Sequence, residues 1–231
     1  RLIWKALNPF FKLISEDISG NHKLRRVKTF VNSLSKPVDE MYEDWIAYFS
    51  IKEINELFKV QQDFHKVVSE VFNAIPTNDL IIKASITDLK TFLVNNLLAY
   101  GDAMSMANSF ELRLPLIDHR IIEFMTSISS DYRIKNGQTK FLMKKLLKGK
   151  VPDEIINKPK LGLNPPMGLW LKNDLNGFIT TYLSKESVEK RGMNYQFVSQ
   201  LLKEHNSGKR DRSLYLWSLI VLEEWHRQNL N

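Results

Sequence analysis

Apolar residues recur every three to four positions along almost the whole chain, which is the spacing that places them on one face of an α-helix. The stretches YEDWIAYFSIKEINELFK (42–59) and NDLIIKASITDLKTFLVNNLLAY (78–100) show this most clearly. No segment alternates apolar and polar residues as a half-buried β-strand does. The pattern therefore predicts an all-α chain.

Capping residues predict where several of these helices begin and end. Asn78 is a suitable N-cap for the second stretch, and Gly101 is a natural stop for it. The next helix is expected over 103–111, and Pro115 should hold the residue before it in an extended conformation. Asp118 then caps the run HRIIEFMTSIS.

Further helices are predicted in the second half of the chain, over 138–150, 173–183, 194–205 and 212–228. The last of them is apolar nearly all round, so it should be buried. Between the first two lies LGLNPPMGLW (161–170), whose two prolines and two glycines predict a largely irregular segment.

Composition removes several classes of protein. A chain of 231 residues can bury a sizeable core, and the lack of cysteine excludes disulfides and thiolate metal sites. The five histidines show no metal-ligand spacing, so no metal site is predicted. No apolar run approaches the ~20 residues that span a bilayer, so we expect no membrane partner. A cytoplasmic location fits the absence of cysteine, and a first residue other than methionine fits a piece of a longer protein.

The chain is basic, with a net charge of +7, and the charge gathers in two regions. Residues 1–36 hold eight lysines and arginines against two acids, and residues 135–160 hold eight lysines against two acids. This balance alone would suit a nucleic acid or a polyanionic small substrate. Because no recognised DNA- or RNA-binding motif occurs, we expect no nucleic-acid partner; such binding would weaken steeply with salt.

Candidate chemistry lies first in DAMSMANSFELRLPLIDHR (102–120). Asp102 falls near the start of a predicted helix, where the helix dipole favours a carboxylate, and Glu111 and Arg113 fall at its exit. Spacing alone leaves two interpretations open. The segment is either the wall of an active site or a polar seam in which an internal ion pair pins a loop.

The second candidate is a pair of lysines, Lys140 and Lys160. Most lysines on a mobile surface are simply solvated. Lys160 differs because it lies in NKPKLGLNPP, an irregular segment that could hold an ammonium group as a point charge against phosphate.

Three segments then match the pattern of one family. DAMSMANSFELRLPLIDHRIIEF (102–124) resembles the motif D-R-x-S-M-A-x-x-x-E-x-R-x-P-[FL]-[LI]-D of the C-terminal synthetase domain of the asparagine synthetase family. The likeness continues through NGQTKFLMKKLLKGKVPDEIINKPKLGL (136–163) and SGKRDRSLYLWSLIVLEEWH (207–226). It covers roughly residues 80–228, whereas the first 75 residues fit a variable helical insert only loosely. We call residues 102–120 the signature segment.

The resemblance implies ATP-dependent amide formation. In this family a carboxylate is adenylated with Mg²⁺ and release of pyrophosphate, and ammonia derived from glutamine attacks the product. The two functional lysines of the family carry over to Lys140 and Lys160, which keep the separation of twenty residues. Fixed cations would stabilise charge on the leaving pyrophosphate. Asp102, Ser105, Glu111, Arg113 and Asp118 are expected to line the substrate cleft.

The departures from the family pattern are equally informative. Ala103 replaces the usual arginine, and Leu116 stands where phenylalanine is common. Neither the S-G-G-x-D-S loop nor the S-G-E-G-x-D-E loop that grips ATP occurs, and the glutaminase cysteine is absent. The resemblance therefore implies the helical C-terminal portion of an α/β adenine-nucleotide α-hydrolase-like domain, with a variable helical insert over 1–77 and the synthetase-like part over 78–231.

Such a chain is expected to be inactive alone and to bind no cofactor tightly. ATP and Mg²⁺ would act in the complete enzyme, whose glutaminase and nucleotide-loop regions would be its partners, together with a small carboxylate substrate. Two alternatives remain open. One is a non-catalytic helical interaction module derived from the same fold, and the other is a helical nucleic-acid-binding protein.

Overall fold

The computed structural model describes residues 23–61, 67–159, 165–208 and 210–230, and these are helical almost throughout. The predicted all-α class is confirmed, with one short hairpin as the only sheet among the described residues. Contacts divide the chain into two compact units. Unit 1 joins Arg1–His65 to Leu163–Asn231, and unit 2 is Lys66–Gly162. The division at residues 77 and 78 follows family resemblance rather than contacts, and it stays a prediction.

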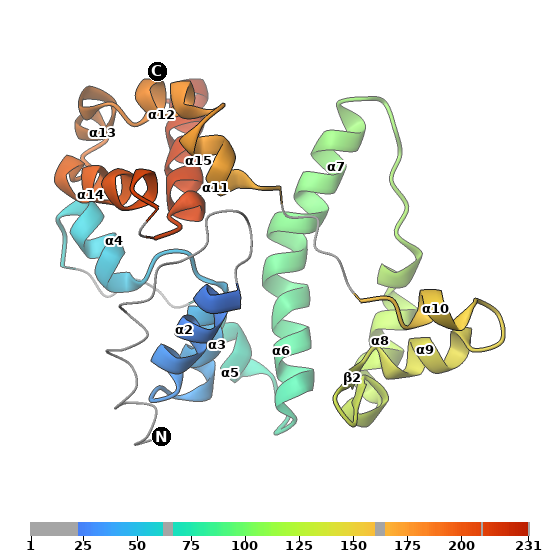
Figure 1. Ribbon diagram of the computed structural model, residues 1–231. Helices are drawn as coiled ribbons and strands as arrows, with labels where there is room; N and C mark the ends of the chain where they lie inside the picture. The colour runs from blue at the N-terminus through green and yellow to red at the C-terminus, as the bar shows by residue number, and fades with distance from the viewer. Residues whose placement is uncertain (1–22, 62–66, 160–164, 209, 231) are drawn as a thin grey trace. The chain divides into compact units, whose positions relative to one another are not determined.

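Unit 1 consists of helices from both ends of the chain (Figure 1). They are α2 (Lys23–Ser33), α3 (Val38–Ile46), α4 (Ile51–Phe58), α11 (Met167–Lys172), α12 (Asn176–Tyr182), α13 (Lys185–Lys190), α14 (Tyr195–Asn206) and α15 (Ser213–Asn229). Buried apolar side chains of six of these helices form one core, which includes Leu57, Leu171, Leu183, Val188, Val198, Leu201, Leu216 and Leu219.

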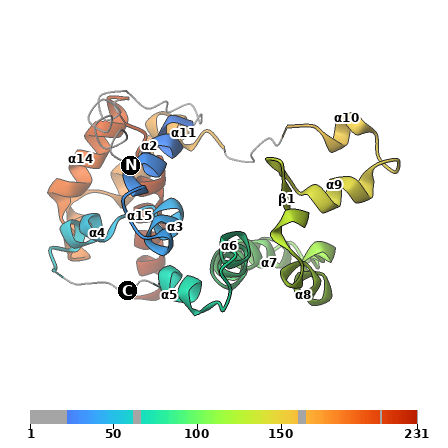
Figure 2. The same ribbon diagram turned by 90° about the horizontal axis from the view of Figure 1, so that it is seen from below.

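The N-terminal helices are fixed to the C-terminal ones by specific contacts. α4 lies beside α14 in both views (Figure 1, Figure 2). The amide N–H of Asn194 donates to the carbonyl of Leu57 at 2.6 Å, and its side chain donates to the carbonyl of Glu56 at 3.2 Å. Phe49 meets the ring of Tyr215 edge-on, with centroids 4.7 Å apart. These contacts explain why segments far apart in sequence share one core.

The helix predicted over 42–59 is two helices, and this part of the prediction is wrong. Ala47 adopts an extended conformation after α3, and Ser50 starts α4 with a capping box. The Ser50 hydroxyl accepts from the Glu53 N–H at 3.3 Å, and Glu53 accepts from the Ser50 N–H at 2.9 Å. Two orphan donors are satisfied at once, which favours a new helix start over continuation.

The C-terminal predictions are mostly correct. α12, α14 and α15 occupy the expected ranges, but α13 was missed and α11 occupies part of the expected irregular segment. Pro166 precedes α11 as its N-cap, a position near a helix start that tolerates proline. α15 buries Leu216 and Leu219 but leaves Trp225 half exposed, so it is not buried all round.

His205 on α14 is fully buried and ties three parts of unit 1 together. Its Nδ1 accepts from the Arg212 N–H at 3.2 Å, so the ring proton sits on Nε2, which donates to the Gly168 carbonyl at 3.0 Å. Burial lowers the pKa of His205, helped by Lys172 and opposed by the Gly168 carbonyl and by Asp211. The fold therefore holds this imidazole neutral.

We expect unit 1 to lose stability as the pH falls below about 6.5, the pKa of an unfolded histidine. Because the pKa of His205 is lower in the folded state, the unfolded chain takes up the proton first, and stability drops from that pH down to the folded value. Urea unfolding followed by tryptophan fluorescence measures this, since all five tryptophans lie in unit 1. In His205→Gln, which cannot take up the proton, the slope between pH 7.5 and 5.5 should shrink; an unchanged slope would contradict the assignment.

Unit 2 contains the segments that carry the family resemblance. Its elements are α5 (Val67–Ala74), α6 (Leu80–Asp88), η1 (Leu89–Leu98), α7 (Ala99–Met106), η2 (Pro115–Ile117), α8 (His119–Ser127), η3 (Ser130–Tyr132), β1 (Ile134–Lys135), β2 (Gln138–Thr139), α9 (Phe141–Leu147) and α10 (Asp153–Ile156). Few of its side chains are buried: among its described residues these are Ser69, Phe72, Ile75 and Thr87.

The long helix of unit 2 differs from the prediction in three ways. Asp79, not Asn78, is the N-cap, and its carboxylate accepts from the N–H groups of Ile81 and Ile82. Gly101 does not end the helix, because α6, η1 and α7 run on as one rod to Met106 (Figure 1). The middle of the rod is a π-helix of 10 residues, a wide turn that occurs mostly in short pieces near functional sites.

A β-hairpin replaces the first residues of the helix predicted over 138–150. Ile134 pairs with Thr139 and Lys135 with Gln138, around a turn in which Asn136 and Gly137 have φ angles of 50° and 76°. Asn-Gly is the preferred pair for such a turn. The expectation of no strand was therefore wrong here, and α9 begins only at Phe141.

Candidate functional site

The signature segment begins on α7 and leaves it through a tight turn. Asp102 lies in the first turn of α7, and the Ser105 hydroxyl donates to the Asp102 carbonyl at 3.1 Å. The Phe110 N–H donates to the Ser105 carbonyl at 2.9 Å, with Ser109 in the left-handed region at φ 59°. This closes the helix as glycine often does. The helix thus ends at Met106, one residue after Ser105, and not at Glu111 as predicted.

After this turn the chain is extended and exposed. Glu111 and Arg113 form an ion pair, but their side chains are 71% and 82% exposed. A pair so open to water contributes little to stability. It is therefore neither a buried seam nor, by itself, an enclosed site.

Asp118 caps α8, as predicted. Its carboxylate accepts from the Arg120 N–H and from two nitrogens of the Arg120 side chain, all at 2.9 Å. These hydrogen bonds, the side-chain ones first, lower the pKa of Asp118. The carboxylate is ionised and already engaged, which favours a structural role in orienting the end of the signature segment.

Lys140 is placed by its backbone. It stands between β2 and α9 with φ 57°, a left-handed conformation that costs a non-glycine residue about 1 kcal/mol. Its side chain is exposed and makes no hydrogen bond that caps the start of α9. Backbone strain of this kind often accompanies a functional position. Lys160, the second predicted lysine, lies outside the described residues.

The hairpin that carries Lys140 is anchored by residues that the sequence analysis missed. The Arg133 guanidinium donates to the Met125 carbonyl at the end of α8, and the Arg133 carbonyl accepts from the Phe141 N–H at 3.0 Å. Burial lowers the pKa of Arg133, and the nearby Asp79 charge opposes this. The hydrogen bond with the Ser130 hydroxyl is the main cause of the lowered pKa of Asp79; burial opposes it, and the N–H groups at the start of α6 lower the pKa further. The Asn-Gly turn was the signal that could have found this arrangement.

Those of the predicted residues that the structure describes therefore share unit 2 but do not form one enclosed site. Asp102 and Ser105 lie on α7, Asp118 lies at α8 and Lys140 lies at α9. Among the residues described, no hydrogen bond or ion pair joins Lys140 to the signature segment. Nor do three or more histidines or acids gather as a metal site in the described part of the chain.

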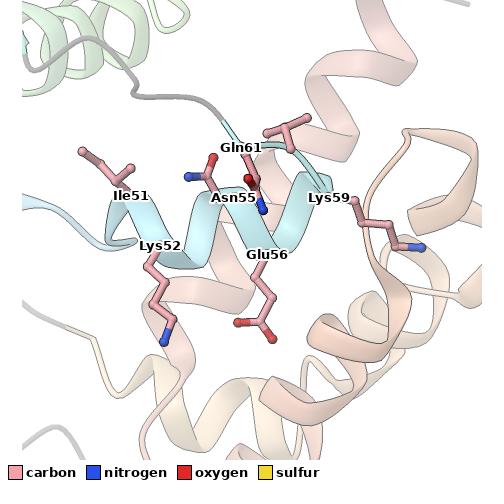
Figure 3. A pocket seen from close by; sticks show the side chains of 7 residues that line it. Ile51, Lys52, Asn55, Glu56, Lys59 and Gln61 are labelled. Carbon is pink, nitrogen blue, oxygen red and sulfur yellow. The ribbon is translucent and has the colours of Figure 1, made fainter.

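A wide hollow of about 870 Å³ lies elsewhere, along α4 in unit 1. Figure 3 shows Lys52 and Glu56 pointing to one side of this helix, with Asn55 and Ile51 pointing to another. Charges of opposite sign on one exposed helix face are typical of a solvated surface. We assign no chemistry to it.

No described helix is both long and apolar enough to cross a membrane.

Comparison with known proteins gives a consistent likeness. The sequence model of the family described as asparagine synthase matches residues 5–227. The chain is 30% identical over 179 residues to glutamine-hydrolysing asparagine synthetase 1 of Bacillus subtilis, covering 78% of this chain and 28% of that protein. It is 26% identical over 206 residues to a putative glutamine-hydrolysing asparagine synthetase of Mycobacterium tuberculosis, covering 87% of this chain and 31% of the other.

A more distant likeness is to an amidase. Amidase chyE of Penicillium rubens is 29% identical over 110 residues, which are 45% of this chain and 16% of that amidase. No solved structure is significantly similar to the chain. The chain thus spans less than a third of the length of the bacterial relatives named above.

Proposed function

The chain belongs to the asparagine synthase family, and we propose that it forms the helical C-terminal part of an ATP-dependent amidotransferase. In the complete enzyme a carboxylate, aspartate in the type family, would be adenylated and then amidated with ammonia from glutamine. The observation that carries this proposal is the signature segment together with Lys140, in family register, on a unit that buries few of its own side chains.

That exposed surface supports the proposal that unit 2 is completed by other parts of the enzyme. The side chains of Tyr100, Phe110 and Leu116 are 66%, 71% and 63% exposed. Large apolar side chains this exposed are the material of which interaction surfaces are made. The relatives are more than three times as long as the aligned part, so a nucleotide-loop region of the same enzyme is the partner that we propose for this surface. A glutaminase region would be the second partner.

The residues on unit 2 fit a nucleotide in part. Lys140 is an exposed cation close in sequence to Lys144 and Lys145, which suits a polyphosphate. When bound, ATP supplies the adenylyl group and Mg²⁺ neutralises phosphate charge. In the complete enzyme Mg²⁺ would be held by phosphate oxygens and by the partner region.

In this proposal Lys140 and Lys160 position and neutralise phosphate, while Glu111 and Arg113 present a paired carboxylate and guanidinium to the cleft. Asp102, Ser105 and Asp118 orient the segment from its two ends. We further propose a cytoplasmic location and no tight cofactor binding by this chain alone. The exposed apolar surface also fits the second candidate, a helical interaction module that kept the fold and lost the chemistry.

Radioactive exchange between pyrophosphate and ATP separates the two candidates. The complete polypeptide should catalyse exchange that depends on a carboxylate such as aspartate, and the 231-residue chain alone should not. Calorimetric titration of the chain with Mg-ATP should show no tight binding. Exchange absent from the complete polypeptide with every carboxylate tried would favour the interaction module, and nanomolar ATP binding by the chain alone would contradict its dependence on a partner region.

A further inference from the structure

A buried carboxylate in unit 1 holds two arginines. Glu223 on α15 is 3% exposed and accepts from the Nε of Arg191 and the Nε of Arg227, both at 2.9 Å. Burial would raise the pKa of Glu223, but these two hydrogen bonds and charges outweigh it and lower the pKa. The carboxylate is therefore ionised, and one negative charge faces two guanidinium groups.

The two arginines differ in how many donors they have left. Arg227 also donates through Nη2 to the Thr181 carbonyl at 3.0 Å and lies 4.3 Å from the ring centre of Tyr182. Arg191 is nine-tenths buried, at 10% exposure, yet only its Nε is bound to a described residue. A guanidinium carries five N–H donors, so its Nη groups keep donors for an acceptor.

Arg191, Glu223 and Arg227 line a hollow of about 450 Å³ between α13 and α15. Ser184, Ser187, Lys190 and Arg191 line one side of it. The Ser184 hydroxyl donates to the Ser187 oxygen at 3.0 Å, so the Ser187 proton is left for another acceptor. Three cationic and two anionic side chains line the hollow, which leaves a charge of +1.

We propose that this hollow binds a tetrahedral oxyanion, namely inorganic phosphate or a phosphate monoester. Arg191 supplies two Nη donors, Lys190 a point charge and Ser187 a hydroxyl. Charge-assisted hydrogen bonds of this kind are the strongest that side chains offer to phosphate. The residues that line the hollow belong to unit 1, whereas the signature segment and Lys140 belong to unit 2, so the site shares no residue with the proposed amidotransferase site.

Calorimetric titration of the full chain with inorganic phosphate, against chloride at matched ionic strength, tests this site. Lys190→Gln should weaken phosphate binding about tenfold and Ser187→Ala about fivefold, since each removes one hydrogen bond to an anion. Lys185→Gln is the matched control, because Lys185 lies exposed on the same helix without lining the hollow. It removes the same charge and should leave the affinity within twofold.

The outcomes are distinct from those of the exchange assay, because no ATP or carboxylate is needed. Tighter binding of glycerol phosphate than of inorganic phosphate would identify a monoester as the ligand. Acetate that binds as tightly as phosphate would overturn the tetrahedral assignment. The site itself is overturned if phosphate does not bind, or if Lys190→Gln and Lys185→Gln weaken binding equally.

Discussion

Replacing Lys140 by alanine in the complete polypeptide is expected to lower carboxylate-dependent ATP–pyrophosphate exchange by about 100- to 1,000-fold. Removal of one fixed group that stabilises transition-state charge typically has an effect of this size. The side chain is exposed and makes no hydrogen bond or ion pair with any described residue of this chain, so its loss should not remove a structural contact. Steady-state exchange at saturating ATP and carboxylate measures the effect.

The backbone of Lys140 offers a way to separate charge from conformation. Both Lys140→Ala and Lys140→Gly remove the ammonium group, but glycine accepts φ 57° without strain. ATP–pyrophosphate exchange should therefore be lost to the same extent in both variants. Amide hydrogen exchange in α9 should be slower in Lys140→Gly than in Lys140→Ala, by a factor that corresponds to about 1 kcal/mol.

Lys145→Ala is the control for the local positive charge, because Lys145 is also exposed and lies on α9. It should lower exchange less than fivefold. If Lys140→Ala and Lys145→Ala have equal effects, the family role of Lys140 does not apply to this chain. If glycine restores exchange that alanine abolishes, the conformation and not the charge is what matters.

Helix content was readable from the sequence because apolar spacing reflects the buried face directly. Asp118 was predicted as a cap and is one, since its side chain satisfies a local backbone donor within two residues. The prediction that Gly101 ends the helix was wrong, because the lack of a Cβ at this position serves close packing and not a helix end. A Cβ at this position would lie 3.2 Å from Leu112, so glycine allows the returning signature segment to approach the helix.

The arrangement around the candidate site was less predictable because it depends on distant partners. Arg133 is partly buried and finds its carbonyl acceptor on α8, and no spacing rule in the sequence predicts that contact. The π-helix over Leu89–Leu98 has the same apolar composition as an α-helix and differs only in its hydrogen bonding. The signature segment is exposed in unit 2, and under the proposed function a second region of the enzyme completes it.

The other large expected effect is on stability, at Glu223. Glu223→Gln should lower the free energy of unfolding of unit 1 by about 3–5 kcal/mol at pH 7, because it leaves Arg191 and Arg227 with no buried counter-charge. Urea unfolding followed by tryptophan fluorescence reports on unit 1 alone, since every tryptophan lies there. Glu189→Gln is the matched control, because Glu189 is exposed on α13, and it should change stability by less than about 0.5 kcal/mol.

The pH dependence of this effect follows from the lowered pKa of Glu223. Its contribution should be complete above about pH 4.3, the pKa of an unfolded glutamate, and should be lost as the pH falls through the lower folded value. The difference between the native chain and Glu223→Gln should therefore be constant from pH 7 to pH 5 and shrink in acid. A difference below about 1 kcal/mol at pH 7 would show that the two arginines find other acceptors or water when Glu223 is lost. It would also contradict the proposal that Glu223 holds Arg191 in place for the oxyanion site.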